Sequence, residues 1–156
     1  MLLFRRQGPS LEVLLVHPGG PFWAKRDRGA WSIPKGEYQP EEEPMDAARR
    51  EFREETGFPP EGDLLPLGEV KQPGGKIVQA WALEGDCDPA LLRSNTFLLE
   101  WPPRSGKKMT VPEADRAAWF SIPEARERLL PGQAPFLDRL VQILEAGGRK
   151  HGRFEA

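Results

Sequence analysis

The segment Pro44–Thr56 constrains this chain more than any other, because it predicts a helix whose apolar face must rest on a core. Pro44 suits the first turn of a helix, and Gly57 directly after the segment is typical of a helix end. Ala48 and Phe52 recur at helical spacing, so they would anchor one face in the interior. The helix therefore predicts a larger fold on which its charged face remains accessible.

Glu51, Glu54 and Glu55 leave one face of this predicted helix at positions i, i+3 and i+4. Like charges at this spacing destabilise a helix by roughly 0.2–0.5 kcal/mol per pair. The cluster is therefore either a solvated face relieved by Arg50 and Arg53, or a site for a divalent cation. A hard ion such as Mg²⁺ takes carboxylate oxygens and usually bridges them to a substrate phosphate.

Predicted strands and helices alternate around the acidic helix. Met1–Arg6 and Leu11–His17 predict a hairpin, because they flank a turn rich in Gly, Pro and Ser. Further elements are expected as strands at Leu64–Lys71, Lys76–Leu83, Thr96–Trp101 and Ala117–Phe120, and as helices at Pro123–Leu130 and Pro135–Glu145. Hairpins mixed with helices in this way favour an α/β fold, in which helices cover a mixed β-sheet.

The length of 156 residues predicts a single domain that can bury a core without disulfides or structural metal. We expect this domain to span residues 1–145 and a flexible tail to follow at 146–156. The net charge of −2 argues against a nucleic-acid polymer or an anionic membrane as partner. No apolar run approaches the roughly 20 residues of a membrane span or the roughly 7–15 of a signal sequence, so we expect a soluble, cytoplasmic protein.

The spacing around the acidic helix resembles a known signature. Gly36, then Glu42 after five residues, then the run from Arg50 to Phe58 after seven more, match the Nudix box. That box reads G, five of any residue, E, seven of any residue and R-E-U-x-E-E-x-G-U, where U is bulky and apolar. All fixed positions agree, and Phe52 and Phe58 fill the U positions, where Ile, Leu or Val is commoner.

The resemblance implies an α/β/α sandwich with a mixed β-sheet. It also implies a pyrophosphohydrolase that uses Mg²⁺ or Mn²⁺ to cleave a nucleoside diphosphate linked to another moiety, by attack of metal-activated water on phosphorus. The implied metal ligands are Glu51, Glu54, Glu55 and the Lys35-Gly36 loop, which would lend a backbone carbonyl. Arg50 would orient the carboxylates, with Glu42 as its partner.

A general base must still take a proton from the attacking water, and three glutamates are candidates. Glu54 comes first, because it belongs to the cluster and need not give both oxygens to metal. Glu113 comes second, since it precedes a predicted strand where many Nudix proteins carry a late glutamate; its alternative is an exposed loop acid. Glu69 comes third, and an exposed acid on a strand is the favoured interpretation there.

The substrate is less constrained. The run from Trp31 to Gly36 resembles the W-x-x-P-K-G motif of dinucleoside polyphosphate and diphosphoinositol polyphosphate hydrolases, so a dinucleoside polyphosphate is one expected small-molecule substrate. Lys35 and Arg28 could contact its phosphates, unless they belong to a merely solvated basic loop. Trp101 beside Arg104 could stack on a base; the alternative is an edge-strand aromatic before a Pro-rich loop.

Three functions stay open at this point. The first is the metal-dependent hydrolase, a monomer or homodimer, for which oxidised nucleoside triphosphates are an alternative substrate. The second is an inactive nucleotide-binding or regulatory module, against which the intact glutamate set counts. The third is an isomerase of isopentenyl diphosphate, which shares the fold and uses a cysteine. Cys87 lies between two aspartates whose charges would raise the pKa of its thiol, and this counts against the third function.

Overall fold

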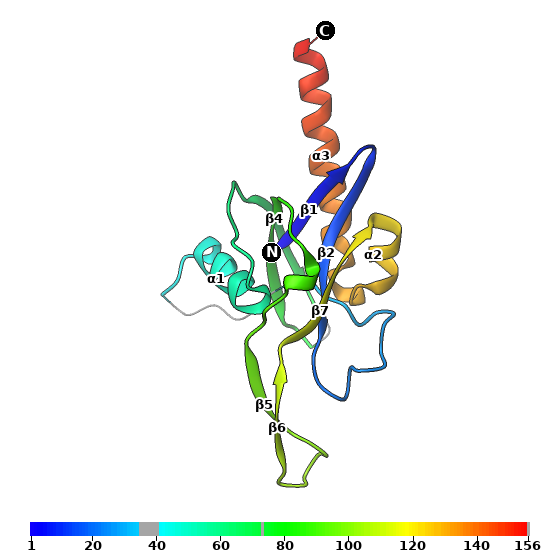
Figure 1. The fold of residues 1–156 in the computed structure, drawn as a ribbon. Coiled ribbons are helices and arrows are strands. Elements are labelled where there is room, and N and C mark those ends of the chain that lie inside the picture. Colours follow the sequence, from blue (N-terminus) through cyan, green and yellow to red (C-terminus); the bar gives the residue numbers. More distant parts are fainter. Residues whose placement is uncertain (35–40, 73, 156) are drawn as a thin grey trace.

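The structure, a computed structural model, describes residues 1–34, 41–72 and 74–155, and the side chains up to residue 147 (Figure 1). Along this part of the chain the elements are β1 (Leu2–Gln7), β2 (Ser10–Pro18), α1 (Pro44–Thr56), β3 (Leu65–Lys71), β4 (Ile77–Glu84), η1 (Pro89–Leu91), β5 (Thr96–Glu100), β6 (Lys108–Pro112), β7 (Ala114–Ser121), α2 (Ile122–Arg128), η2 (Pro131–Gln133) and α3 (Ala134–Glu155).

Five strands form one mixed sheet in the order β3-β4-β1-β2-β7. β1 runs parallel to β4, and the other neighbours are antiparallel. β5 and β6 pair with each other as a separate hairpin, which projects from the body of the molecule (Figure 1). The chain passes from β6 into β7 through Glu113, so this hairpin is attached directly to one edge of the sheet.

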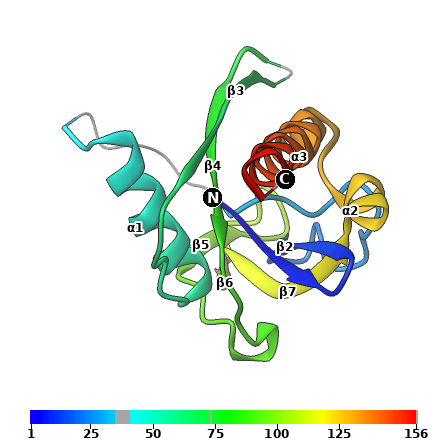
Figure 2. The same cartoon turned by 90° about the horizontal axis from the view of Figure 1, so that it is seen from above.

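Helices cover both faces of the sheet, with α1 on one face and α2 and α3 on the other (Figure 2). Side chains alternate along the central strands: Leu3 and Leu14 pack with Phe52 of α1, whereas Leu2 packs with Phe136 of α3. A strand buried on both faces reads as a nearly continuous apolar run, which explains the composition of β1 and β2. The predicted α/β/α sandwich with a mixed sheet is confirmed.

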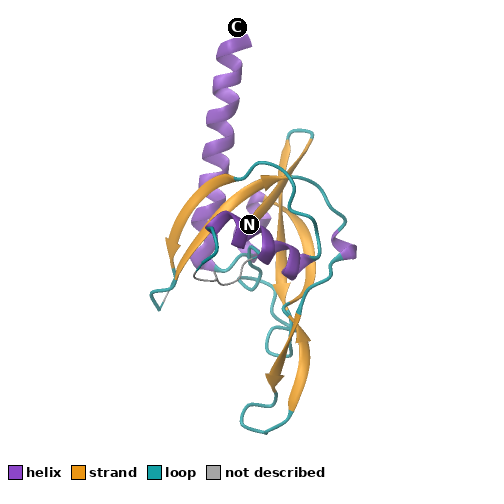
Figure 3. Cartoon of the chain, turned by 90° about the vertical axis from the view of Figure 1, so that its left-hand side faces the viewer, coloured by secondary structure: helices purple, strands orange, loops and turns teal. Residues whose placement is uncertain are grey.

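Most predicted boundaries differ from the structure by one or two residues, and three differences are larger. β6 is absent from the prediction, because a short segment that ends in Pro112 becomes a strand only by pairing with β5. β7 begins at Ala114 rather than Ala117, where it already pairs with Pro18 of β2. α3 continues past Glu145 and extends beyond the sheet (Figure 3). The flexibility expected of residues 146–156 and the domain limits stay predictions.

No helix in the described residues has the length and apolarity needed to cross a bilayer.

Candidate active site

The C-terminal end of α1 is held tightly beside the segment that leads into β5. Gly57 adopts φ 78° and donates its N–H to the carbonyl of Arg53 at 2.7 Å. A Cβ at this glycine would lie 3.0 Å from the backbone oxygen of Arg93, so the close approach as well as the left-handed backbone favours glycine. The acidic end of the helix therefore faces a fixed neighbouring segment.

Arg50 connects the acidic side chains of this region. Its Nε and Nη2 donate to the two carboxylate oxygens of Glu42, each at 2.8 Å, and its Nη1 donates to Glu54 at 2.9 Å. The carboxylate of Glu51 lies 3.8 Å from Nη2. The hydrogen bonds that Arg50 donates to Glu42 are the largest cause that raises the pKa of Arg50, so the guanidinium stays charged. Arg50 thus relieves part of the repulsion along the helix.

The three glutamates of α1 differ in environment. Glu51 and Glu55 are buried, with 7% and 8% of their surface exposed, whereas Glu54 is exposed. Buried carboxylates need a positive partner, and oxygen donors of this kind suit Mg²⁺ or Mn²⁺. Among the described side chains, which end at residue 147, no three ligand-type groups lie close enough to hold one metal ion, so sharing one ion requires a change of rotamers. The predicted ligands Lys35 and Gly36 lie outside the described residues.

Glu113 lies next to the acidic end of α1, although the two are far apart in sequence. The N–H of Asn95 donates to the carbonyl of Glu54, and the carbonyl of Asn95 accepts from the N–H of Glu113, both at 2.8 Å. Burial, followed by the negative charge of Glu54, raises the pKa of the Glu113 carboxyl. The structure therefore brings together the first two candidate bases. Glu69 is exposed on β3, at the opposite edge of the sheet.

We expect Glu54→Gln to lower the pKa of Glu113 in the metal-free protein. The glutamine removes the negative charge that opposes ionisation of Glu113, so this carboxyl loses its proton at lower pH. Carboxyl ¹³C NMR titration in the presence of a chelator measures the change, with Glu124→Gln on α2 as the control. An unchanged titration of Glu113 in Glu54→Gln would show that the two carboxylates are too far apart to interact.

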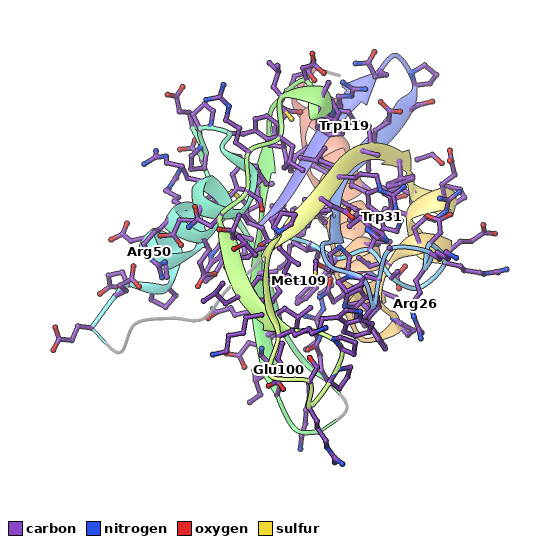
Figure 4. All side chains as sticks on the ribbon, turned by 60° about the horizontal axis from the view of Figure 1, so that its bottom comes forward. Arg26, Trp31, Arg50, Glu100, Met109 and Trp119 are labelled. Atoms are coloured by element: carbon purple, nitrogen blue, oxygen red, sulfur yellow. The ribbon has the colours of Figure 1, made fainter. Side chains whose placement is uncertain are left out.

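Trp31 lies on the face of the sheet opposite α1, within the core under α2 and α3. Its indole N–H donates to Asp27 at 2.7 Å, and its ring meets Phe120 edge-on. Figure 4 shows Trp31 and Arg50 on opposite sides of the strands. Trp31 also borders an open cavity of about 1060 Å³ along the outer edge of β7. Arg93 lines the same cavity. Its predicted role in substrate binding stays a prediction.

The remaining substrate-binding candidates are spread over the surface. Arg28 is exposed in the loop after β2, and Arg104, with φ 61°, lies in the turn that joins β5 to β6. Trp101 borders a hollow together with Phe22 and Trp23, which sequence reasoning did not assign to a site. The sequence signal that could have identified this hollow is the pair of adjacent aromatic residues, Phe22 and Trp23, in a loop rich in Gly and Pro.

The environment of Cys87 does not favour a nucleophilic thiolate. Burial raises the pKa of its thiol to about 11, with a further contribution from Asp86. The expected direction is therefore confirmed, but burial rather than neighbouring acids is the larger cause. A thiol with this pKa is almost fully protonated near neutral pH, which counts against the isomerase.

A family model described as the NUDIX domain matches residues 1–140. The chain belongs to the NUDIX family. Solved NUDIX-like structures share its fold: the Ap4A hydrolase of C. elegans in a binary complex has a TM-score of 0.64 and 18% identity, covering 93% of this chain and 96% of that one. A mutT/nudix family protein from Listeria innocua has a TM-score of 0.61 and 20% identity, covering 94% and 92%.

Curated relatives of this NUDIX chain match over shorter shares of their length. A Myxococcus xanthus protein named octanoyltransferase is 32% identical over 79% of this chain and 30% of its own length. An RNA pyrophosphohydrolase of Hahella chejuensis is 40% identical over 38% of each chain. The chain thus spans about a third of the curated relatives that it matches, and their activities do not transfer to it directly.

Proposed function

We propose that this NUDIX protein hydrolyses a phosphoric anhydride bond of a nucleotide, with Mg²⁺ or Mn²⁺ held by Glu51, Glu54 and Glu55. One observation carries the proposal: the backbone of Asn95 is hydrogen-bonded to both Glu54 and Glu113, so Glu113 lies beside the acidic face of α1. The names of two relatives, an RNA pyrophosphohydrolase and an Ap4A hydrolase, agree with a substrate that contains a diphosphate bridge. A dinucleoside polyphosphate is the first substrate class to test.

The residues of this site divide the chemical work. A bound divalent ion supplies positive charge, which neutralises the diphosphate and lowers the pKa of a water molecule. Arg50 keeps the carboxylate of Glu54 oriented through its 2.9 Å hydrogen bond. Glu54, or Glu113 linked to it through the backbone of Asn95, would accept the proton that water releases on attacking phosphorus.

Metal-dependent cleavage tests this proposal. The full chain is incubated with Mg²⁺ or Mn²⁺ and with dinucleoside polyphosphates, oxidised nucleoside triphosphates, sugar nucleotides and 5′-triphosphorylated RNA, and the products are identified. Oxygen-18 water marks the phosphorus that is attacked. We expect anhydride cleavage that stops when the metal is chelated. Nucleotide binding without products would instead identify a regulatory module, and calorimetric titrations without metal binding would contradict the metal site.

A further inference from the structure

A small hollow lies between the loop after β2 and the projecting β5–β6 hairpin. It has a volume of about 300 Å³, and its lining is mostly apolar, with four aromatic residues among the wall residues. The aromatic walls are Phe22 and Trp23 from the loop, and Phe97 and Trp101 from β5 and the residue after it. The volume lies at the small end of ligand pockets, where one planar ring system fits but a whole dinucleotide does not.

The loop that forms one wall is held against the hairpin. A Cβ on Gly19 would lie 2.0 Å from the carbonyl oxygen of Pro112, and one on Gly20 would lie 3.6 Å from Leu99. Phe22 and Trp23 meet edge-on, with ring centroids 5.0 Å apart. The backbone of the loop therefore packs closely against the hairpin, and the two segments form opposite walls of the hollow.

One ring on each wall is open to a ligand. Phe22 of the loop is 51% exposed and Phe97 of β5 is 42% exposed. The guanidinium of Arg26 lies 4.3 Å from the centroid of the Phe22 ring, so a positive charge stands beside the aromatic surface. Aromatic rings beside a cation are the surface on which nucleobases stack.

The hollow is also linked to the candidate active site through the backbone. The N–H of Gly19, one of its wall residues, donates to the carbonyl of Glu113 at 3.3 Å. Glu113 in turn is joined through Asn95 to Glu54 on α1. A ligand whose diphosphate lies at the glutamates would reach the aromatic hollow past Glu113.

From this arrangement we propose that the hollow between Phe22, Trp23, Phe97 and Trp101 binds a nucleobase of the substrate. The proposal rests on the proposed function, because it assigns to the same site the part that recognises the substrate. It makes the hairpin, rather than the cavity beside Trp31, the principal determinant of affinity for the nucleoside. The side chains that form it come from two segments that are far apart in sequence.

A pair of probes that cannot be cleaved at the diphosphate tests the proposal by calorimetry with the full chain and Mg²⁺. The first is α,β-methylene-ADP, and the second is methylenediphosphonate, which has the same phosphorus framework without a nucleoside. We expect Phe97→Ala and Phe22→Ala to weaken binding of α,β-methylene-ADP by roughly 5- to 100-fold and to leave binding of methylenediphosphonate unchanged. Both phenylalanines are exposed, so their truncation spares the core.

Leu98→Ala is the matched control. Leu98 is adjacent to Phe97 on β5 but points to the opposite face of the hairpin and is 67% exposed. Its truncation should leave the affinity for α,β-methylene-ADP unchanged. Equal affinities of Phe97→Ala and Leu98→Ala for this probe would overturn the proposal. So would sedimentation data in which Phe97→Ala loses self-association but not nucleotide affinity, since the surface would then join two copies of the chain.

The test separates the two proposals. If the wild-type chain cleaved nucleotides but bound α,β-methylene-ADP and methylenediphosphonate with equal affinity, the nucleobase pocket would be overturned and the hydrolase would stand. Selective loss of α,β-methylene-ADP binding in Phe97→Ala, without cleavage of any nucleotide by the wild-type chain, would support the pocket and overturn the hydrolase.

Discussion

Glu55→Gln is expected to lower kcat by about two to four orders of magnitude while the protein remains folded. The glutamine keeps the shape of the side chain but removes the negative charge that would hold the divalent ion. Because Glu55 is 8% exposed, water cannot readily replace the lost ligand. Glu54→Gln should have an effect of the same order, since Glu54 also faces Glu113.

Steady-state kinetics with Mg²⁺ and the best substrate from the nucleotide panel provide the measurement, and thermal unfolding verifies the fold. Asp46→Asn is a suitable control, because it removes a carboxylate from the exposed first turn of the same helix. If both glutamine variants of the cluster turned over substrate at nearly the normal rate, the assignment of the catalytic helix would be wrong.

Phe52→Ala is expected to lower the free energy of unfolding by about 3–5 kcal/mol. Phe52 is 1% exposed and packs with Ala48 and Trp81, so its removal leaves a cavity between α1 and the sheet. The loss also acts on the site, because Phe52 lies between Glu51 and Glu54 in the sequence and holds their helix in place.

Urea denaturation followed by tryptophan fluorescence measures this effect. Met45→Ala is the control on the same helix, since Met45 is 44% exposed and its truncation should cost less than about 1 kcal/mol. Equal midpoints for Phe52→Ala and Met45→Ala would mean that α1 is not anchored through Phe52.

Local patterns in the sequence were sufficient for the elements that depend on local chemistry. Pro44 and Gly57 mark the ends of α1 as predicted, and the turn before Lys76 joins β3 to β4. The pairing of Arg50 with Glu42 followed from the resemblance to the Nudix box, and the structure shows it as a bidentate ion pair.

Features that depend on which strands become neighbours could not be predicted from the sequence. β6 has too few apolar residues to be recognised before its pairing with β5 is known. The approach of Glu113 to Glu54 depends on the segment around Asn95 passing the end of α1. Trp31 is the first residue of the motif that suggested substrate binding, but it packs in the core under α2 and α3, on the face of the sheet opposite α1, and this face can be assigned only when the sheet is known.

The connections among Glu54, Asn95, Glu113 and Gly19 are made by main-chain amides and carbonyls. Side chains on the hairpin and on the loop after β2 can therefore be exchanged without altering the spacing between the reaction centre and its neighbours. Transplanting the hairpin between homologues should redirect substrate preference and retain the chemistry. A scaffold of this kind lets evolution diversify selectivity separately from catalysis.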